Sequence, residues 1–189
     1  MVSLKQPNES LEARLRGMVH ADAELLALLA CVRNLGLNDW CIAAGAVRNR
    51  VWQRLHGQTS LLPASDVDVC YFDASMAPDH ARAVHNALAA AMPQVRWDVV
   101  NQAWSHHFNG LSAVHSLQQG LASWPETATA VGVWQDDAGE VRIVAPLGLE
   151  DLFGLRLRRN PAFADESVFR QRVAHKQWQR HWPLLVLLA

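Results

Sequence analysis

The sequence contains few cysteines, and this disfavours two common ways of stabilising a small protein. Among 189 residues only Cys31, Cys41 and Cys70 are cysteines, and each stands beside apolar residues. Three scattered thiols argue against a disulfide framework and against a zinc site. We therefore expect the protein to work in a reducing, cytoplasmic setting.

Long apolar runs are also absent. The longest apolar run near the C-terminus covers residues 183–189, whereas a membrane-spanning helix needs about 20 apolar residues. The N-terminal residues 1–10 lack the apolar run of a signal peptide. Both features predict a protein that does not associate with a membrane.

Neither sign of charge dominates the composition. The 17 basic residues oppose 18 acidic ones, and the resulting net charge of −1 does not indicate that the whole molecule binds nucleic acid. The distribution is less even, because residues 156–180 contain seven Arg or Lys and two acids. This segment is either a solvated basic helix or a surface that meets a phosphate-bearing substrate or acceptor.

The abundant residues are those of an ordinary globular core, since 50% of the chain is apolar and 19% is charged. Apolar spacing predicts both helices and strands, and no repeat or linker separates them, so one domain is the simplest organisation. Helices are predicted over 11–35 (as a pair), 47–55, 78–91, 112–123, 149–153 and 165–182, and strands over 39–44, 67–72, 95–101, 127–135 and 140–145.

Two short motifs carry residues suited to phosphate chemistry. Residues 45–50 (Gly-Ala-Val-Arg-Asn-Arg) place a small-residue turn before a basic helix, where backbone N–H groups and Arg side chains can bind phosphate oxygens. Downstream, Asp66 and Asp68 stand one residue apart at the start of an apolar strand. Period-two geometry puts both carboxylates on one face of that strand, and two ionised carboxylates so close together usually share a cation.

These motifs resemble those of the nucleotidyltransferase superfamily that includes DNA polymerase beta and the CCA-adding enzymes. Residues 44–49 are similar to the Gly-Gly-x-x-Arg-Asp element of the CCA-adding and poly(A) polymerase branch. The closer likeness is to small bacterial proteins described as nucleotidyltransferase-like, and it covers about residues 40–182. The segments that carry it are 45–49, 66–69 (Asp-Val-Asp-Val), 97–103 (Trp-Asp-Val-Val-Asn-Gln-Ala), 124–131 (Trp-Pro-Glu-Thr-Ala-Thr-Ala-Val) and 146–152 (Pro-Leu-Gly-Leu-Glu-Asp-Leu).

The resemblance implies an α+β fold, in which a nucleotidyltransferase-type mixed β-sheet is flanked by α-helices in a single domain over residues 1–189. It implies N-terminal helices over 1–36, a catalytic core over 37–155 and a basic C-terminal helical segment over 156–189. It also implies an EC 2.7.7-type reaction, in which a nucleoside monophosphate passes from a nucleoside triphosphate to an unknown acceptor hydroxyl and pyrophosphate is released.

The resemblance further implies a carboxylate site. Asp66 and Asp68 are expected to hold Mg²⁺, or Mn²⁺ in its place, on the triphosphate. Asp98 matches the third carboxylate that the superfamily carries on a neighbouring strand. With the other two it is expected to hold a second ion, and it is also a candidate general base for the acceptor hydroxyl.

The resemblance places the nucleotide against the turn that precedes the basic helix. Gly45, Ala46, Arg48 and Asn49 are the expected binding residues, with Gly45 letting the backbone approach the phosphates and Arg48 contacting them. Many superfamily members carry Ser where Ala46 stands, so a phosphate-binding hydroxyl is missing here.

Two other functions stay open. A non-catalytic nucleotide-binding module is the first alternative, because Ala46 lacks the hydroxyl. A metal-dependent phosphohydrolase is the second, although in haloacid dehalogenase-type phosphatases the Asp pair follows its strand, whereas here it precedes it. Near the predicted site, Asp73 is expected to act as a turn or cap residue, and Asn101 and Gln102 either contact the acceptor or cap a loop.

Overall fold

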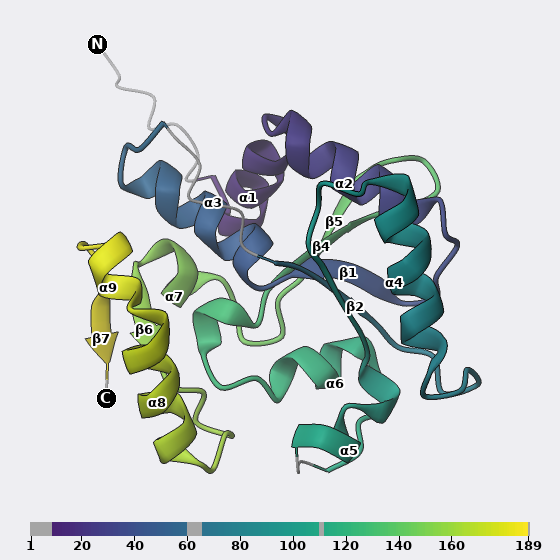
Figure 1. The fold of residues 1–189 in the computed structure, drawn as a ribbon. Helices are drawn as coiled ribbons and strands as arrows, with labels where there is room; N and C mark the ends of the chain where they lie inside the picture. The colour runs from purple at the N-terminus through teal and green to yellow at the C-terminus, as the bar shows by residue number, and fades with distance from the viewer. Residues whose placement is uncertain (1–8, 60–65, 110–111, 189) are drawn as a thin grey trace.

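The computed structural model describes residues 9–59, 66–109 and 112–188. The signal-peptide expectation concerns mainly residues 1–8, which lie outside the described residues. The elements form a central sheet with helices around it (Figure 1). The helices are α1 (Leu11–His20), α2 (Ala23–Arg33), α3 (Gly45–Leu55), α4 (His80–Ala91), α5 (His106–Asn109), α6 (Leu117–Ala122), α7 (Glu150–Phe153), α8 (Glu166–Lys176) and α9 (Trp178–His181), with 3-10 turns at η1 (Gln102–Trp104) and η2 (Thr127–Thr129).

The central sheet has the strand order β3-β2-β1-β4-β5. Strands β2 and β3 are parallel and are joined through α4, while the other neighbouring pairs are antiparallel. This arrangement confirms the predicted α+β fold with a mixed sheet flanked by helices in a single domain. The strands are β1 (Trp40–Ala43), β2 (Val67–Tyr71), β3 (Trp97–Asn101), β4 (Gly132–Gln135) and β5 (Val141–Val144), and a separate parallel pair consists of β6 (Arg156–Arg158) and β7 (Val186–Leu188).

The two N-terminal helices begin and end at residues that favour helix boundaries. Ser10 accepts a hydrogen bond from the Ala13 N–H at 3.1 Å, and Asp22 accepts one from the Leu25 N–H at 2.8 Å, so both helices have side-chain N-caps. Gly36 follows α2 with φ of +64°, a conformation that glycine adopts without steric cost. The predicted pair of helices over 11–35 is confirmed.

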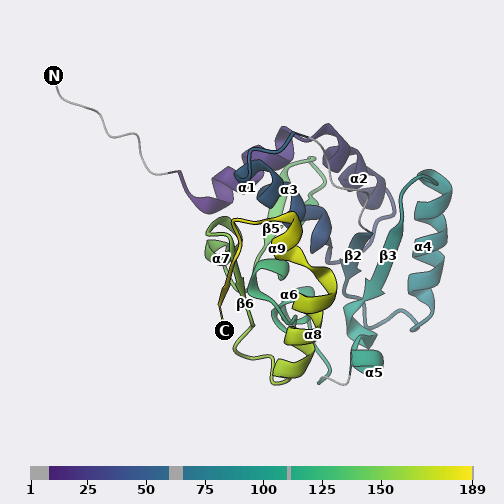
Figure 2. The same cartoon turned by 60° about the vertical axis from the view of Figure 1, so that its left-hand side comes forward.

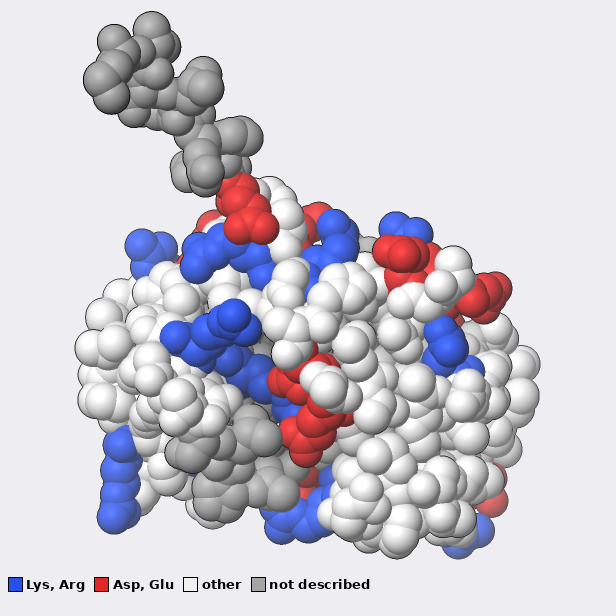
Figure 3. Space-filling view, turned by 90° about the horizontal axis from the view of Figure 1, so that it is seen from above, with Lys and Arg blue, Asp and Glu red and all other residues white. Residues whose placement is uncertain are grey.

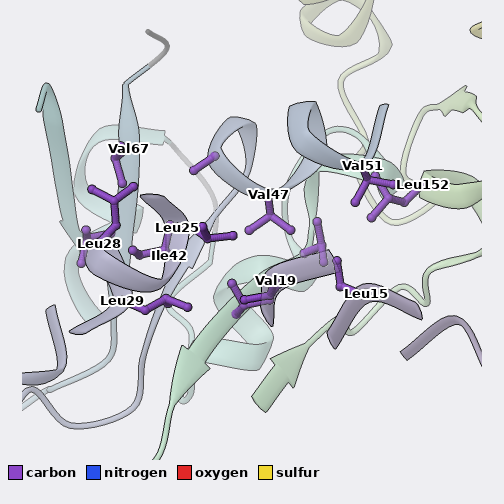
Figure 4. Packing of buried hydrophobic residues seen from close by; sticks show 14 of the residues in the cluster. Leu15, Val19, Leu25, Leu28, Leu29, Ile42, Val47, Val51, Val67 and Leu152 are labelled. Carbon is purple, nitrogen blue, oxygen red and sulfur yellow. The ribbon is translucent and has the colours of Figure 1, made fainter. Parts of the chain in front are cut away.

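One face of the central sheet packs against helices to form the main core. Alternate residues of β1 and β2, among them Ile42 and Val67, pack there against α1, α2 and α3. Figure 4 shows how the leucines and valines of these helices meet the strands in a single continuous core. The opposite face carries Cys41 and Cys70, which α6 covers with Leu117 and Leu121.

Residues 165–182 do not form one helix, so this prediction is wrong. The helix stops at Gln177, whose φ of +48° and ψ of +39° are left-handed, and α9 starts at the next residue. This break turns Trp178 and Trp182 into the core, where they are 4% and 1% exposed. Burial of two indole rings outweighs the strain of one left-handed residue.

The segment 156–189, expected to be helical, also contains strands β6 and β7. In two views α8 and α4 lie on opposite sides of the central strands (Figure 1, Figure 2). The C-terminal segment therefore packs as a lobe beside the sheet.

The strand predicted over 127–135 is wrong in its first half, because residues Thr127–Thr129 form the 3-10 turn η2. Threonine favours strands, but tertiary contacts decide here. The Thr127 hydroxyl donates to Asp151 Oδ2 at 2.8 Å, and the Thr129 hydroxyl accepts from Arg48 at the same distance.

Within the described residues, no helix is long and apolar enough to cross a bilayer.

Candidate active site

Strand register brings the two predicted motifs to one place. Ala43, the last residue of β1, pairs with Asp68 of β2, so the turn at Gly45 begins beside this carboxylate. Asp68 in turn pairs with Asp98 on the parallel strand β3. Because directly opposed residues project from the same face of a sheet, Asp68 and Asp98 lie side by side on the face opposite the main core. Asp66 directly precedes β2.

These residues line a cleft of about 470 Å³ between the sheet and the C-terminal segment. Six of the seven predicted site residues belong to its lining, and Ala46 does not. Ala46 is 1% exposed and packs in the main core, so its missing hydroxyl is not a gap in the cleft wall. The lining comprises Ala44, Gly45, Arg48, Asn49, Asp66, Asp68, Arg96, Asp98, Thr129, Arg172, Lys176, Trp178, His181 and Trp182.

Charges of both signs meet in this part of the molecule. Figure 3 shows acidic and basic side chains side by side near the middle of one face. Burial raises the pKa of Asp68 to about 6, and the neighbouring Asp98 also acts to raise it, while Arg48 and Lys176 act in the opposite direction. The ionised form of Asp68 therefore lacks full compensation from the protein.

Asp66 contacts a cation of the protein. Its Oδ1 lies 3.2 Å from Nε of Arg96, and both side chains are largely exposed. Among the described residues, no three His, Cys, Asp or Glu side chains are close enough together to hold one metal ion. The adjacent pair Asp68 and Asp98 nevertheless offers the hard oxygen donors that Mg²⁺ prefers, and the raised pKa of Asp68 fits a site that a cation would complete.

The turn before α3 is strained. Ala44 has φ of +52° and ψ of −124°, a conformation that favours glycine, and its carbonyl accepts the Arg48 N–H at 2.8 Å to open the helix. This sharp turn places the first residues of α3 beside Asp68. The first N–H groups of a helix have no partner within it, so they can bind an anion in the cleft.

Arg48 is buried, with 6% of its surface exposed, and burial lowers its pKa to about 10. Its Nη1 donates to Thr129 at 2.8 Å, while Nε and Nη2 donate to Oδ1 of Asn49 at 3.2 and 3.0 Å. The guanidinium lies 4.9 Å from the Trp52 ring centre and 5.0 Å from that of Trp178. These contacts hold Arg48 at the cleft wall, and within the described residues they leave two of its five N–H donors for a ligand.

Sequence reasoning did not single out Glu126, Arg172 or Lys176. Arg172 and Lys176 line the cleft from α8, and Arg172 Nε donates to the fully buried Glu126 at 2.6 Å. Glu126 lies in the segment 124–131 that carries the family resemblance, and the sequence signal for the two cations was the excess of basic residues over 156–180. That signal applies to these two cations, whereas the other five bond outside the cleft (Arg156, Arg158, Arg159, Arg170 and Arg180).

Two of the neighbouring polar residues have structural roles. Asp73 accepts from the Ser75 N–H at 2.9 Å, which confirms the predicted turn role. Asn101 is 3% exposed. Its Oδ1 accepts a hydrogen bond from the Asp73 N–H at 3.1 Å, and its Nδ2 donates to the Asp73 carbonyl at 2.7 Å. Asn101 therefore caps a loop and does not line the cleft.

Comparison with protein families gives a match to a nucleotidyltransferase family over residues 30–187. The chain belongs to this family. The matched residues include the central sheet and the C-terminal lobe. None of the curated proteins compared with the chain shows a significant match.

Solved structures give a second line of comparison. A protein whose NMR structure reveals a CCA-adding enzyme head domain is 26% identical, with a TM-score of 0.83 over 96% of this chain and 97% of that one. A CCA-adding enzyme in complex with CTP is 13% identical, with a TM-score of 0.59 over 94% of this chain and 43% of that one. A tRNA-processing enzyme is 17% identical, with a TM-score of 0.51 over 97% and 45%. The chain spans less than half the length of the last two proteins, which share its fold.

Proposed function

We propose that this nucleotidyltransferase moves a nucleoside monophosphate from a nucleoside triphosphate to an acceptor hydroxyl and releases pyrophosphate. The observation that carries the proposal is the register match of Asp68 and Asp98 beside the turn that opens α3. It joins a carboxylate pair to backbone N–H groups that can bind an anion. Family membership and the head-domain fold support nucleotidyl transfer in general.

The carboxylates are proposed to bind Mg²⁺, or Mn²⁺ in its place. When bound, the metal would neutralise triphosphate charge and make the acceptor hydroxyl more acidic. Asp68 and Asp98 supply ligand oxygens, and Asp98 also accepts the proton of the hydroxyl. Asp66 joins them after its carboxylate leaves Arg96.

The phosphates of the nucleotide are also proposed to lie against the N-terminus of α3. Gly45 offers its backbone N–H group to the phosphates, and Arg48 offers its two remaining donors, whereas Ala46, predicted to bind the nucleotide, packs in the core. Asn49 holds the Arg48 guanidinium in place through its Oδ1. The CTP complex of the CCA-adding enzyme, which shares this fold, supports a nucleoside triphosphate as substrate.

Transfer can be tested before the acceptor is known. Wild-type protein, Mg²⁺ and each ribonucleoside triphosphate labelled on its α-phosphate are incubated with cell extract, and labelled products are identified. We expect a labelled acceptor and pyrophosphate from wild type and neither from Asp66→Ala. Nucleotide binding without any labelled product would instead indicate a binding module. Rapid release of inorganic phosphate from simple esters would indicate a phosphohydrolase.

A further inference from the structure

Helix α8 brings two cations to the cleft wall that faces the carboxylates. Arg172 and Lys176 are four residues apart, so both project from the same side of the helix, and both line the cleft. Without them, the lining would set three carboxylates against Arg48 and Arg96. A triphosphate carries several negative charges, so the two α8 cations make the cleft suitable for it.

The buried carboxylate of Glu126 holds Arg172 in place. Its Nε and Nη2 donate to Oε1 and Oε2 of Glu126 at 2.6 and 3.2 Å, and Glu126 is 0% exposed. A fully buried carboxylate needs such a partner, because an unpaired buried charge is strongly destabilising. Within the described residues, Nη1 of Arg172 has no acceptor. The pairing thus fixes the guanidinium and leaves Nη1 available to a ligand.

Lys176 also lines the cleft, but unlike Arg172 it has no acidic partner within the described ranges to fix its side chain. Among the residues that the structure describes, its ammonium has no hydrogen bond and no ion pair, although its charge acts to lower the pKa of Asp68. By contrast, Arg170 on the same helix pairs with Glu166 at 2.6 Å and does not line the cleft. Lys176 is therefore a cleft cation that has no direct hydrogen-bond or ion-pair partner in the described part of the chain.

We propose that Arg172 and Lys176 bind the β- and γ-phosphates of the nucleoside triphosphate, and that Glu126 is a positioning residue which aims Arg172. The carboxylates of the sheet then lie at the α-phosphate and the acceptor hydroxyl. The two cations of the C-terminal lobe bind the pyrophosphate that is released. This inference rests on the proposed function. It adds that one substrate is shared between two parts of the chain far apart in sequence.

The first test compares triphosphate with monophosphate binding. Titration calorimetry with Mg²⁺ measures ATP against AMP and CTP against CMP for wild type and Lys176→Gln. We expect the variant to lose about tenfold in triphosphate affinity, the value of one charge-assisted contact, and less than about twofold for the monophosphates. Arg170→Gln is the matched control on the same helix and should change neither affinity. Equal losses for both ligand classes, or no loss for either, would overturn the proposal.

Arg172 needs a milder change, because its removal leaves Glu126 buried without a partner. Arg172→Lys keeps the charge but loses the guanidinium, which can bond Glu126 and a phosphate at the same time. We therefore expect selective weakening of triphosphate binding. Glu126→Gln separates aiming from charge. If Glu126 aims Arg172, triphosphate affinity falls; if only local charge matters, removal of a negative charge strengthens binding, and the positioning role is refuted. Melting temperatures establish that each variant is folded.

Chemical labelling gives a readout on the unmodified protein. The chain has two lysines, Lys5 and Lys176. Acetylation by an N-hydroxysuccinimide ester, mapped by mass spectrometry, should slow at Lys176 in the presence of Mg²⁺ and ATP or CTP, with Lys5 as the labelling reference. AMP should protect much less. Nucleotide binding that depends on Asp68 but leaves Lys176 unprotected would overturn this inference alone, whereas absence of all nucleotide binding would overturn the proposed function as well.

Discussion

The face of the sheet that looks away from the main core has two ends with opposite properties. At one end Cys41 and Cys70 pair across β1 and β2, and α6 covers them, so both are buried. At the other end, two residues away on β2, Asp68 pairs with Asp98 and faces the cleft. The same two strands therefore contribute both to a closed apolar cluster and to an open polar site.

Helix cover explains this contrast. Helix α6 (Leu117–Ala122) packs on the cysteines, and none of its residues lines the cleft that contains the acids. A carboxylate under such a helix would lose its hydration without gaining a partner. The open end keeps its acids hydrated in part, and the remaining deficit appears as the raised pKa of Asp68. The candidate site therefore lies outside the cover of this helix.

The largest expected effect comes from the open end. Asp68→Asn removes one of the paired charges, and we expect nucleotidyl transfer to fall about a thousandfold. The reason is that the metal, which neutralises the phosphate charge, loses its main carboxylate ligand. Pyrophosphate release or transfer of an α-phosphate label measures this. Asp73→Asn, two residues beyond the end of β2, keeps its turn hydrogen bonds and is the matched control. Near-normal transfer in Asp68→Asn would show that the site lies elsewhere.

At the closed end we expect an effect on stability alone. Leu121 is 0% exposed and packs on the cysteine pair, so Leu121→Ala should lower the free energy of unfolding by about 3 kcal/mol through lost burial and a cavity. Urea unfolding measures the change, and ATP affinity of the folded variant should stay the same. Leu184→Ala, at a residue that is 57% exposed, should change stability by less than about 0.5 kcal/mol. Equal effects of the two substitutions would contradict the assignment of a closed cluster.

The stability of the open end should depend on pH through the ionisation of Asp68. The folded-state pKa of Asp68 is raised from 3.8 to about 6, so its contribution to stability is present below about pH 4 and is lost as pH rises through 6. In EDTA at pH 7.5, Asp68→Asn should therefore be more stable than wild type, by up to about 3 kcal/mol at 1.36 kcal/mol per pKa unit. The gain should vanish near pH 4. Melting temperatures across this range check the sign, and a gain independent of pH would show that ionisation of Asp68 is not its cause.

The smallest expected effect concerns the turn beside the open end. Ala44→Gly relieves the strain of φ +52° and should raise the free energy of unfolding by about 1 kcal/mol after the added freedom of the unfolded chain is subtracted. The neighbouring Ala43→Gly, in regular strand β1, should instead lower it by a similar amount. Thermal unfolding of both variants measures the difference. A loss of stability in both would mean that Ala44 is not strained.

Local patterns predicted the elements around the cleft well. Apolar spacing and boundary residues such as Gly36 placed α1, α2, α3 and α4, while short apolar runs placed β1 and β2 and period-two alternation placed β3, all to within about two residues. They failed at η2, where the hydroxyls of Thr127 and Thr129 bond distant side chains, and at Gln177, where two buried indoles override local preference. Distant partners set those conformations, and a local pattern holds no information about them.

The same division holds for the candidate site. Asp66 and Asp68 stand out in the sequence because two acids at the start of an apolar strand have little structural use. Arg172 and Lys176 do not, because they share a basic segment with five cations that bond outside the cleft. Only their position on α8, opposite the acids, distinguishes them.

The sequence by itself indicated the family and the mixed sheet through its resemblance to nucleotidyltransferases, and the carboxylate motif followed from residue types suited to phosphate and metal. Tertiary structure alone decided that β2 and β3 align Asp68 with Asp98, that α6 packs on the cysteines and does not line the cleft, and that the C-terminal lobe lies opposite the acids. Electrostatic and packing forces act through space, so residues more than 100 positions apart in the chain can share one cleft, and their relation becomes visible only in the folded protein.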